Sequence, residues 1–590
     1  MKKMDSEVSK KLRVQTKQVI ELFEDRVKVL QKRRDLLQMF RNIDPRGCLE
    51  TARKLIGEGE WTALGIDGSM DFDEHLDLLL FYVYATGYKC PFYVRRDGVS
   101  VDVKNAVRNM PLSASAAIPL WVEDLLNVSR GLSISFEYEV RRIAEAIPIS
   151  IMTMAELFLA LKSIENPTVK LLLLDRPLSG TYPSLLKSSR IILSSRDSVL
   201  TSMETTKGRV SLTDIWIASI LGPGCFYVPP RRPYSEFALI KALLERHEIS
   251  KEEACAILNV DAVRLEKILK HIHLREMTFN SKIIDEFGNM LRLRSEVFGY
   301  WDRVYEASIE VSNRIFKGVD YPLRIGESWL TSHDINLLNL FLLYELLRRA
   351  LANPTILVGI AKDTEASEIV RSVIPFMRFK DSIKVEQPIP SVRNNRRFLS
   401  LLSSLNYDVI KTPWRTPCYD SCFTTISFSK IEGFRPARKV VSREALLIRV
   451  NFQLKSLEAD EAVRSMVFMY DRPFNPLFDK PGDTLNLKDD GGTITIRPVF
   501  EGQEPSLLDD LILYLLSLMD NPEVLEAYGY NQLLYLADKA VKIEVEFMKS
   551  SLRTIAELEL APLASRRRLF TFRSYRELRR ILEVSRRLGS

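Results

Sequence analysis

Short apolar runs alternate with longer helical patterns through much of this chain. Three of the runs are typical of buried strands: Trp61 to Asp67, Val169 to Asp175 and Thr355 to Ile360. Ile151 to Ile164, before the second run, and Thr331 to Ala352, before the third, have the apolar spacing of helices. Helices that lead into successive buried strands are expected to cover a sheet. The sequence therefore predicts a mixed α/β fold with flanking helices.

The N-terminal segment, Asp5 to Asn42, is highly charged but has apolar residues at helical spacing. Because it holds few helix breakers before Asp44-Pro45-Arg46-Gly47, we predict one long helix that ends at this turn. A helix with so much exposed charge either packs on a partner or second copy, or lies on its own globule. The sequence leaves both alternatives open.

The chain between the second and third strands is far longer than a sheet connection requires, so it holds an insertion. Its pattern predicts three helices, Glu236 to Arg246, Ser250 to Leu258 and Asp261 to His271. Ser250 and Glu253 form a capping-box pattern at the start of the second helix, and the whole is a helix-turn-helix arrangement. In a DNA-reading version Lys267 and Lys270 would face a groove or the backbone. The alternative is a plain packing module.

These patterns divide the chain into five parts: residues 1–45, the charged helix; 46–204 and 326–560, the two halves of the α/β domain; 205–325, the helical insertion; and 561–590, a basic tail. The tail contains nine arginines with Phe570, Phe572 and Tyr575 between them, which suits phosphate contact and base stacking. The alternative is an amphipathic closing helix with a solvated basic face. The candidate DNA contacts in the tail are Arg566, Arg567, Arg568 and Arg573.

Composition narrows the class of protein. Of 590 residues, 46% are hydrophobic and 27% are charged, which is ordinary globular usage. No stretch approaches the roughly 18 uncharged apolar residues of a membrane span, and the N-terminus lacks an apolar signal core, so we expect a cytoplasmic protein. The net charge of +7 is too small for a surface that coats nucleic acid uniformly. Of six cysteines only Cys418 and Cys422 are close in the sequence. The cysteines are therefore either buried thiols or include one disulfide, and the sequence leaves both alternatives open.

Acidic side chains mark the ends of two predicted strands. Asp67 and Asp175 each close an apolar run. Taken singly, each is an ordinary turn residue, but carboxylates on neighbouring strands also suit a hard cation such as Mg²⁺ or Mn²⁺. Glu156 lies in the helical pattern before the second strand, and Asp538 lies among apolar neighbours, where an unpaired carboxylate is costly. Lys362 follows the third strand, where it would contact a phosphate as a point charge.

In their order along the chain, these segments resemble the NurA family of archaeal and bacterial DNA-end nucleases, which have an RNase H-like fold. The matching segments are Ile66-Asp67-Gly68-Ser69, the helix bearing Glu156, Asp175-Arg176-Pro177-Leu178, the strand leading into Gly359-Ile360-Ala361-Lys362, Leu446 to Leu454 and the helix opened by Gly529-Tyr530. The resemblance implies that acidic residues converge on one or two Mn²⁺ or Mg²⁺ ions and that Lys362 steadies the phosphate. The implied metal ligands are Asp67, Glu156, Asp175 and Asp538.

The resemblance also implies an activity and partners. The implied activity is 5′ to 3′ resection of DNA ends, with endonuclease action on single strands, in double-strand break repair. The implied partners are DNA, a second copy of the chain and HerA, a hexameric DNA-translocating ATPase. The sequence contains no G-x-x-x-x-G-K-[ST] loop for ATP phosphates, so a motor would be a separate protein.

Two positions depart from the family. The last helix of the family carries a histidine where this chain has Asp538, and all five histidines here lie at or before His333. Arg176 stands where the family has a glycine. Asp538 either completes an all-carboxylate site or marks weakened chemistry. The alternative function is therefore a catalytically weakened DNA-binding or motor-adaptor subunit that keeps the fold.

Overall fold

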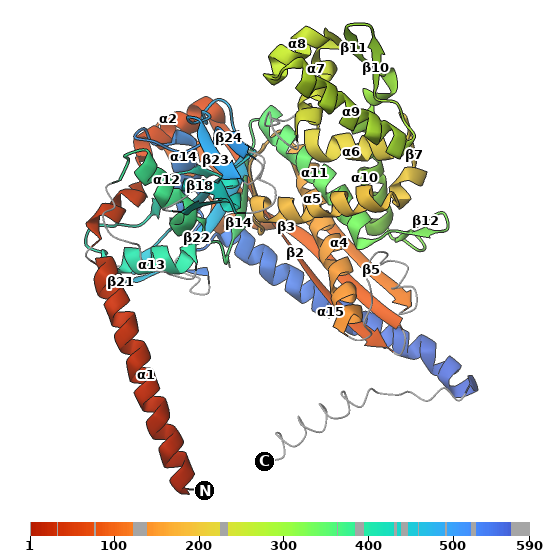
Figure 1. The fold of residues 1–590 in the computed structure, drawn as a ribbon. Coiled ribbons are helices and arrows are strands. Elements are labelled where there is room, and N and C mark those ends of the chain that lie inside the picture. The colour runs from red at the N-terminus through yellow and green to blue at the C-terminus, as the bar shows by residue number, and fades with distance from the viewer. Residues whose placement is uncertain are drawn as a thin grey trace.

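Within the described residues, an 11-stranded mixed sheet runs through the molecule. The structure is a computed structural model that describes residues 2–31, 33–75, 78–121, 138–224, 234–362, 364–383, 394–429, 433–437, 446–457, 460–489, 492–520 and 527–567 (Figure 1). The strands of the sheet are β1 (Arg41–Asn42), β2 (Gly59–His75), β3 (Leu78–Val94), β4 (Val99–Val101), β5 (Val107–Trp121), β6 (Val169–Leu174), β14 (Ile356–Ala361), β15 (Trp414–Arg415), β16 (Tyr419–Asp420), β19 (Leu447–Gln453) and β22 (Phe468–Pro473).

Strands β4, β3, β2, β6 and β14 lie side by side in that order. Strand β3 pairs antiparallel with β2 and β4, whereas β6 runs parallel to β2 and β14 runs parallel to β6. The strands β2, β3 and β4 are thus antiparallel neighbours, and β6 and β14 both run parallel to β2. This arrangement is that of the sheet in an RNase H-like fold. Beyond β14 the sheet continues with antiparallel β22 and β19. The predicted fold class, a mixed α/β sheet with flanking helices and a helical insertion, is confirmed.

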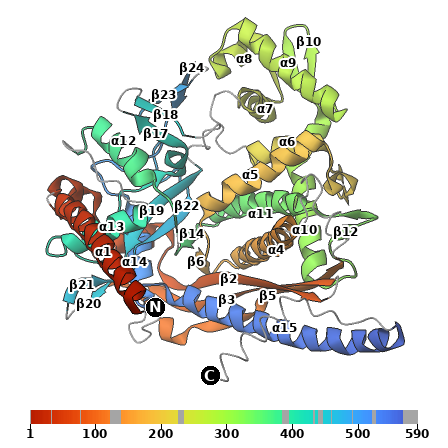
Figure 2. The ribbon, with the colours of Figure 1, turned by 60° about the horizontal axis from the view of Figure 1, so that its bottom comes forward.

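Helices cover both faces of this sheet, and Figure 2 shows the β2, β3 and β5 strands between α4 and α15. Leu64 and Ile66 of β2 enter a core shared with α4 (Tyr138–Ile164), α5 (Leu178–Ser195) and α11 (Ser332–Ala352). Ala63 enters a second core, shared with α2 (Pro45–Leu55), α14 (Leu507–Leu518) and α15 (Gln532–Arg567). Side chains alternate between the two faces along a strand, so consecutive residues of β2 point at different helices.

Helix α4 fills the space between the sheet and α11. Its part Ala146–Ile164 is long and apolar enough to cross a membrane, but 78% of the apolar window is buried inside the protein. Met154, Leu157 and Leu161 belong to the core on this face of the sheet. The apolar surface of this helix is therefore used in internal packing.

The strand that carries Asp67 does not end there, contrary to the prediction. Strand β2 continues to His75, and Asp67 lies near its middle. What ends near Asp67 is the parallel pairing with β6, whose last paired residues are Ile66 and Leu174. Beyond that point β2 pairs with β3 alone, from Asp67 opposite Thr86 to His75 opposite Leu78. Asp67 does not begin a turn because it and the residues after it pair with β3 in one long ladder.

The N-terminal helix is shorter than predicted. Helix α1 (Lys2–Gln31) ends at Gln31 and is followed by a short 3₁₀ helix, Arg34–Met39. Asp44-Pro45 begins a helix instead of ending one. The carboxylate of Asp44 accepts hydrogen bonds from the backbone N–H groups of Arg46 and Gly47, and Pro45 opens α2. An acidic N-cap followed by proline is the usual start of a helix, which the sequence interpretation missed.

In the predicted insertion, residues 205–325, helices pack on a small sheet. Its elements are α6 (Leu212–Leu221), α7 (Ser235–Arg246), β9 (Glu248–Ser250), α8 (Lys251–Leu258), α9 (Ala262–Phe279), β10 (Ile284–Phe287), β11 (Met290–Leu293) and α10 (Tyr300–Phe316). The predicted capping box of Ser250 and Glu253 is present at the start of α8. Strands β10, β11 and β9 form a three-stranded sheet that was not predicted. Three helices closed by such a sheet form a winged helix-turn-helix unit.

Candidate metal centre

Three carboxylates from three separate elements meet beside the central strands. Asp67 lies within β2, Asp175 directly follows β6 and Asp538 lies on α15, and one oxygen of each lies within 4.8 Å of the others. Strands β2 and β6 are neighbours, and Ile66 pairs with Leu174, so the residues that follow lie side by side. Helix α15 crosses β2 on the face towards which Asp67 points. The tertiary structure therefore unites residues that are far apart in the sequence.

Gly359 makes room for the turn that carries Asp175. This residue of β14 lies so close to the turn that a Cβ atom at position 359 would be 2.4 Å from the carbonyl oxygen of Arg176. Real Cβ atoms do not approach other atoms so closely. The atom that a Cβ would meet belongs to the backbone, so it could not move aside as a flexible side chain could. The absence of a side chain at Gly359 therefore lets Asp175 reach the neighbouring strands.

Asp67 is unusually hard to ionise. It is buried, with 6% of its surface exposed. Burial, together with the negative charges of Asp175 and Glu156, raises the pKa of Asp67 to about 9, although the ammonium of Lys362 opposes the rise. Carboxylates that repel one another in this way are favourable ligands for a cation, which would relieve the repulsion.

Lys362 extends from the end of β14 into the centre. Its Nζ lies 2.5 Å from Oδ2 of Asp175 and 3.8 Å from Oδ1 of Asp538. Burial alone would lower the pKa of Lys362, but the charges of Asp175 and Asp538 outweigh burial, and the net shift is upward. The side chain is therefore an ammonium held among carboxylates.

Tyr530 holds both members of this ion pair. Its hydroxyl donates a hydrogen bond of 3.2 Å to Oδ1 of Asp175, and Nζ of Lys362 lies 4.7 Å from the centre of its ring. Burial and then the charge of Asp175 raise the pKa of Tyr530 well above its ordinary value, so the phenol stays protonated as a donor. In the sequence Tyr530 was noted only as part of a helix start.

Glu156 lies on the other side of β2 and does not join the three carboxylates. A Cβ atom at Gly68 would be 2.7 Å from Oε1 of Glu156, so this face of β2 looks towards α4. Asp67 precedes Gly68 in the strand and points to the opposite face. Oε2 of Glu156 accepts a hydrogen bond from Nε of Arg176, whose Nη1 donates to Oγ1 of Thr153 at 2.9 Å. Burial raises the pKa of Glu156, and Arg176 opposes the rise.

The three-carboxylate centre fits a hard divalent cation. All three donors are carboxylate oxygens, which Mn²⁺ and Mg²⁺ prefer, and repulsion from Asp175 and Glu156 adds to burial in raising the pKa of Asp67, so a cation there would favour its ionised form. Asp67, Asp175 and Asp538 would hold the ion. With Asp538 the donor set is made of carboxylates alone.

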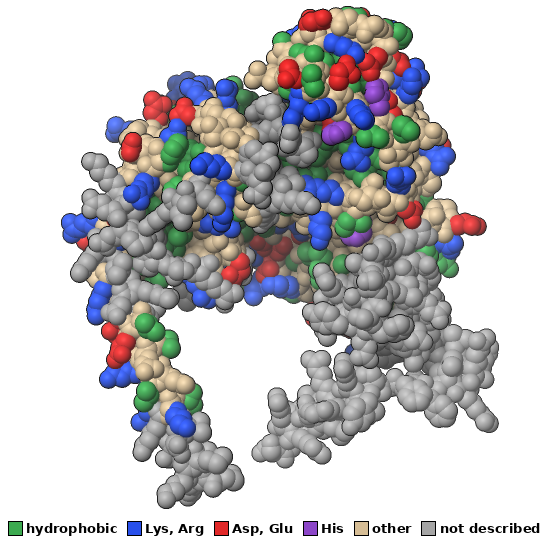
Figure 3. Space-filling model, in the orientation of Figure 1, with side chains coloured by type: hydrophobic (Ala, Val, Ile, Leu, Met, Phe, Trp, Pro, Cys, Tyr) green, Lys and Arg blue, Asp and Glu red, His purple; other side chains and the backbone are tan. Residues whose placement is uncertain are grey.

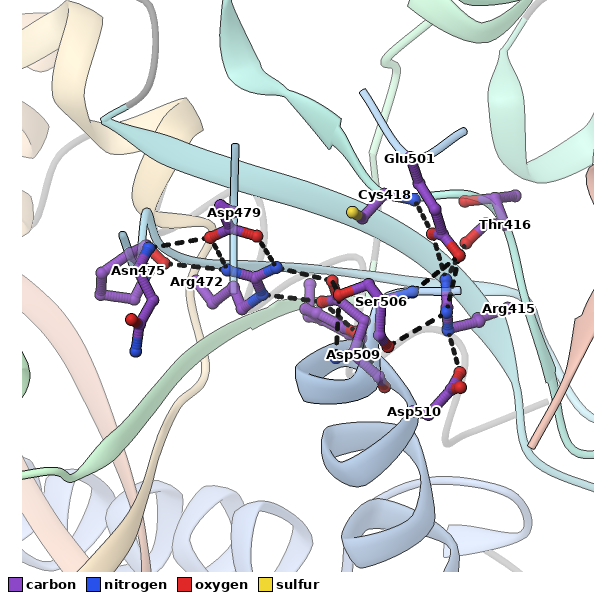
Figure 4. Close-up of polar contacts among 12 residues, drawn as sticks. Arg415, Thr416, Cys418, Arg472, Asn475, Asp479, Glu501, Ser506, Asp509 and Asp510 are labelled. Carbon is purple, nitrogen blue, oxygen red and sulfur yellow. Dashed lines mark hydrogen bonds and ion pairs between the residues drawn. The ribbon is translucent and has the colours of Figure 1, made fainter. Parts of the chain in front are cut away.

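A second cluster, Cys418, Asp479 and Asp509, has similar spacing but does not suit a metal. Figure 4 shows both carboxylates held by the guanidinium of Arg472, which donates to Asp479 at 2.6 and 2.7 Å and to Asp509 at 2.6 and 2.8 Å. Burial raises the pKa of Cys418 well above its ordinary value. Cys418 is a free thiol, as is Cys422, so the structure excludes a disulfide between them.

A basic pocket adjoins the centre on the side of Lys362. It has a volume of about 580 Å³ and is lined by Thr364, Glu365, Asn394, Arg396, Arg397, Ser400 and Leu401. Nη1 of Arg396 donates to the carbonyl oxygen of Lys362 at 3.3 Å, which connects the pocket to the backbone of the residue that extends into the centre. Guanidinium groups bind phosphate oxygens well. The sequence interpretation missed this pocket because Arg396 and Arg397 stand within an ordinary helical segment.

Of the predicted DNA contacts, the structure describes the side chains of two, and both lie on the insertion, away from this centre (Figure 1). Lys267 and Lys270 are exposed on α9 of the insertion. Arg566 and Arg567 are in the last turn of α15, but their side chains lie outside the described residues. Arg568 and Arg573 lie wholly outside them. The structure therefore brings together Asp67, Asp175, Asp538 and Lys362, with Glu156 beside them.

Comparison with known proteins found a distant similarity to solved structures. No protein-family model and no curated protein matched the sequence. Among solved structures, the chain is similar to the NurA nuclease from Sulfolobus solfataricus, with 10% identity, a TM-score of 0.36, and 93% of this chain and 97% of that chain covered. It is also similar to NurA with manganese, with 11% identity, a TM-score of 0.30 and coverage of 92% and 97%. NurA bound to dAMP and manganese matches with 10% identity, a TM-score of 0.29 and coverage of 85% and 90%. Likenesses this distant leave the activity to be decided by the side chains of the chain itself.

Proposed function

We propose that this protein is a divalent-metal-dependent deoxyribonuclease that hydrolyses phosphodiester bonds. The observation that carries the proposal is the convergence of Asp67, Asp175 and Asp538 next to the ammonium of Lys362. A bound Mn²⁺ or Mg²⁺ would supply Lewis-acid activation of water and of the phosphate. Water as the attacking group leaves no covalent intermediate on the protein.

The side chains around the centre have separate tasks in this proposal. Lys362, held by Asp175 and Tyr530, presents a fixed positive charge to the phosphate as negative charge develops on it. Arg396 and Arg397, in the adjoining pocket, bind a neighbouring phosphate of the same strand. Because these groups are positioned before substrate arrives, little reorganisation is needed during the reaction.

The proposed substrate is DNA at a double-strand break, resected 5′ to 3′ with some endonuclease action on single strands. The proposed partners are a second copy of the chain and a HerA-like hexameric ATPase. The order of motifs in the sequence supports these assignments, and the lack of an ATP-binding loop calls for a separate motor. Helix α1 also exposes Leu12, Val19 and Leu22, which suits packing on a partner. The five described cysteines are free, as in a reducing cytoplasm.

The second candidate function is a DNA-binding or motor-adaptor subunit with weakened chemistry. Two observations favour it: Asp538 stands in place of a histidine, and Glu156 is engaged by Arg176. The gathering of three carboxylates around one point, with Asp67 buried, argues against it, since a protein without a cation gains little from that cost.

The decisive experiment measures cleavage of end-labelled single- and double-stranded DNA, and of matched RNA, with Mn²⁺, Mg²⁺ or EDTA. We expect metal-dependent DNA cleavage that falls by about 10²-fold or more in Asp67→Asn and in Asp538→Asn, since each removes an anionic ligand. Glu546→Gln, an exposed carboxylate further along α15, is the charge-matched control and should cleave like the wild type. No cleavage with any metal, while DNA or a HerA-like ATPase is still bound, would favour the adaptor.

A further inference from the structure

Arg176 is a buried cation placed directly beside the candidate metal centre. It follows Asp175 at the end of β6, and its side chain is 11% exposed. Its guanidinium donates two hydrogen bonds, from Nε to Glu156 and from Nη1 to Thr153. Both acceptors lie on α4. The backbone position of Arg176 is fixed as well, since its carbonyl oxygen lies against Gly359. The guanidinium is therefore held where it is from two directions.

Glu156 is a further carboxylate near the centre, since its charge acts on Asp67. It is 2% exposed and approaches from the α4 face of β2, whereas Asp67, Asp175 and Asp538 meet on the α15 face. One of its oxygens already accepts from Arg176, and the other lies over the backbone of Gly68. To bind a cation, Glu156 would have to release Arg176, and a buried guanidinium without a partner is strongly unfavourable.

The charged side chains near the centre form two groups, one on each face of β2. On the α15 face three carboxylates are accompanied by Lys362 and by the exposed Lys542, which pairs with Asp538 at 2.8 Å, so ionisation of all three leaves one negative charge in excess for a divalent ion. On the α4 face the single charge of Glu156 is balanced by the single charge of Arg176. A second divalent ion on the α4 face would add positive charge to a pair that is already neutral.

We propose that this protein holds one divalent cation, at Asp67, Asp175 and Asp538, and that the guanidinium of Arg176 stands beside Glu156 in the place of a second cation. The inference rests on the proposed function, whose metal centre it refines. In this arrangement Arg176 is a positioning residue: it fixes Glu156 and keeps the count of metal ions at one. Removing Arg176 should free Glu156 and the space beside it for a second ion.

The test is the number of Mn²⁺ ions bound per chain, measured by the loss of the free-Mn²⁺ signal in electron paramagnetic resonance. We expect one ion for the wild type, two for Arg176→Ala, and one again for Arg176→Ala/Glu156→Gln, which lacks the freed carboxylate. Arg176→Gln keeps donors for Glu156 and Thr153 without the charge, so it should also bind two and serves if Arg176→Ala does not fold.

The insertion offers a matched control. Arg303 forms an ion pair of 2.6 Å with Asp214, and the two side chains are 11% and 2% exposed, the same values as for Arg176 and Glu156. Arg303→Ala should lower the urea midpoint as Arg176→Ala does but leave the count at one ion. Circular dichroism confirms that each variant is folded before the count.

The possible results separate the two proposals. Two ions in the wild type, or one ion in both folded Arg176 variants, would overturn the one-cation inference and leave the metal-dependent nuclease intact. No saturable Mn²⁺ binding in the wild type, with Asp67→Asn indistinguishable from it, would overturn both the inference and the proposed function.

Discussion

At the scale of single residues, the centre depends on positions where a side chain is absent as much as on those that carry charge. Gly359 admits the turn after β6, and Gly68 leaves room for Glu156. The chain thus brings backbone and carboxylates closer together than residues with a Cβ atom would allow. A methyl group at either position would disturb the centre without changing its charge.

We expect Gly359→Ala to lower stability by about 1–3 kcal/mol, the usual cost of overpacking, and to weaken Mn²⁺ binding. The new Cβ would meet the carbonyl oxygen of Arg176 and push Asp175 away from Asp67. Urea unfolding and Mn²⁺ titration measure the two effects. Gly98→Ala is the control, because nothing lies within 4 Å of the Cβ it would add. Equal Mn²⁺ affinity in the two variants would show that the turn does not position the ligand.

At the scale of elements, the winged helix-turn-helix unit has a fold that suits two roles, DNA contact and plain packing. Helix α9 exposes Lys267 and Lys270, but Glu266 beside them pairs with Lys251 at 2.9 Å. Figure 3 shows acidic and basic side chains mixed over the insertion. A mixed surface weakens general attraction to DNA, so any contact would depend on individual lysines.

Replacing Lys267 and Lys270 together by alanine should weaken binding to duplex DNA and reduce the slope of log affinity against log salt by about 1 for each phosphate that a lysine no longer neutralises. The physical reason is that fewer counterions are released on binding. Fluorescence anisotropy at several salt concentrations measures both. Lys317→Ala, exposed at the end of α10, is the control. An unchanged slope in the double variant would identify the insertion as a packing module.

At the scale of the whole molecule, buried ion pairs join distant parts of the sheet to α14. Arg472 of β22 binds Asp509 of α14, and Arg415 of β15 binds Asp510 of the same helix at 2.7 Å. These pairs lie in the half of the sheet beyond β14. They fix α14, which packs in the same core as the start of α15, the helix that delivers Asp538.

Asp509→Asn should lower the free energy of unfolding by about 3–5 kcal/mol at pH 7, because Arg472 loses part of its buried counter-charge. Burial alone would raise the pKa of Asp509, but the charge and hydrogen bonds of Arg472 outweigh burial and hold this pKa well below its ordinary value. A carboxyl whose pKa is lowered by folding contributes stability that is complete above about pH 4 and is lost as the pH falls below that.

Urea unfolding at pH 7 and at pH 3 tests this prediction. The difference between wild type and Asp509→Asn should shrink at the lower pH. The control, Asp483→Asn, removes the partner of Lys380 at a site where the carboxylate is 82% exposed, and it should leave the midpoint unchanged. A difference for Asp509→Asn that stays constant with pH would mean that its charge does not carry the stability.

The sequence by itself determined the local features of this protein. Apolar runs predicted β6 and β14, helical spacing predicted α11 and the core part of α4, and Ser250 with Glu253 predicted the start of α8. Each follows from the propensity or capping of neighbouring residues, which needs no knowledge of distant parts of the chain. The position of Asp175 directly after a strand is of the same kind.

Only the tertiary structure decided which side chains meet. The run after Asp67 continued as a strand because β3 pairs with it. Asp538 joined Asp67 and Asp175 through the packing of α15, whereas Glu156 came from the opposite face of β2 and paired with Arg176. Alternation along a strand gives each carboxylate its face, but the face becomes known only when register and helix packing are fixed.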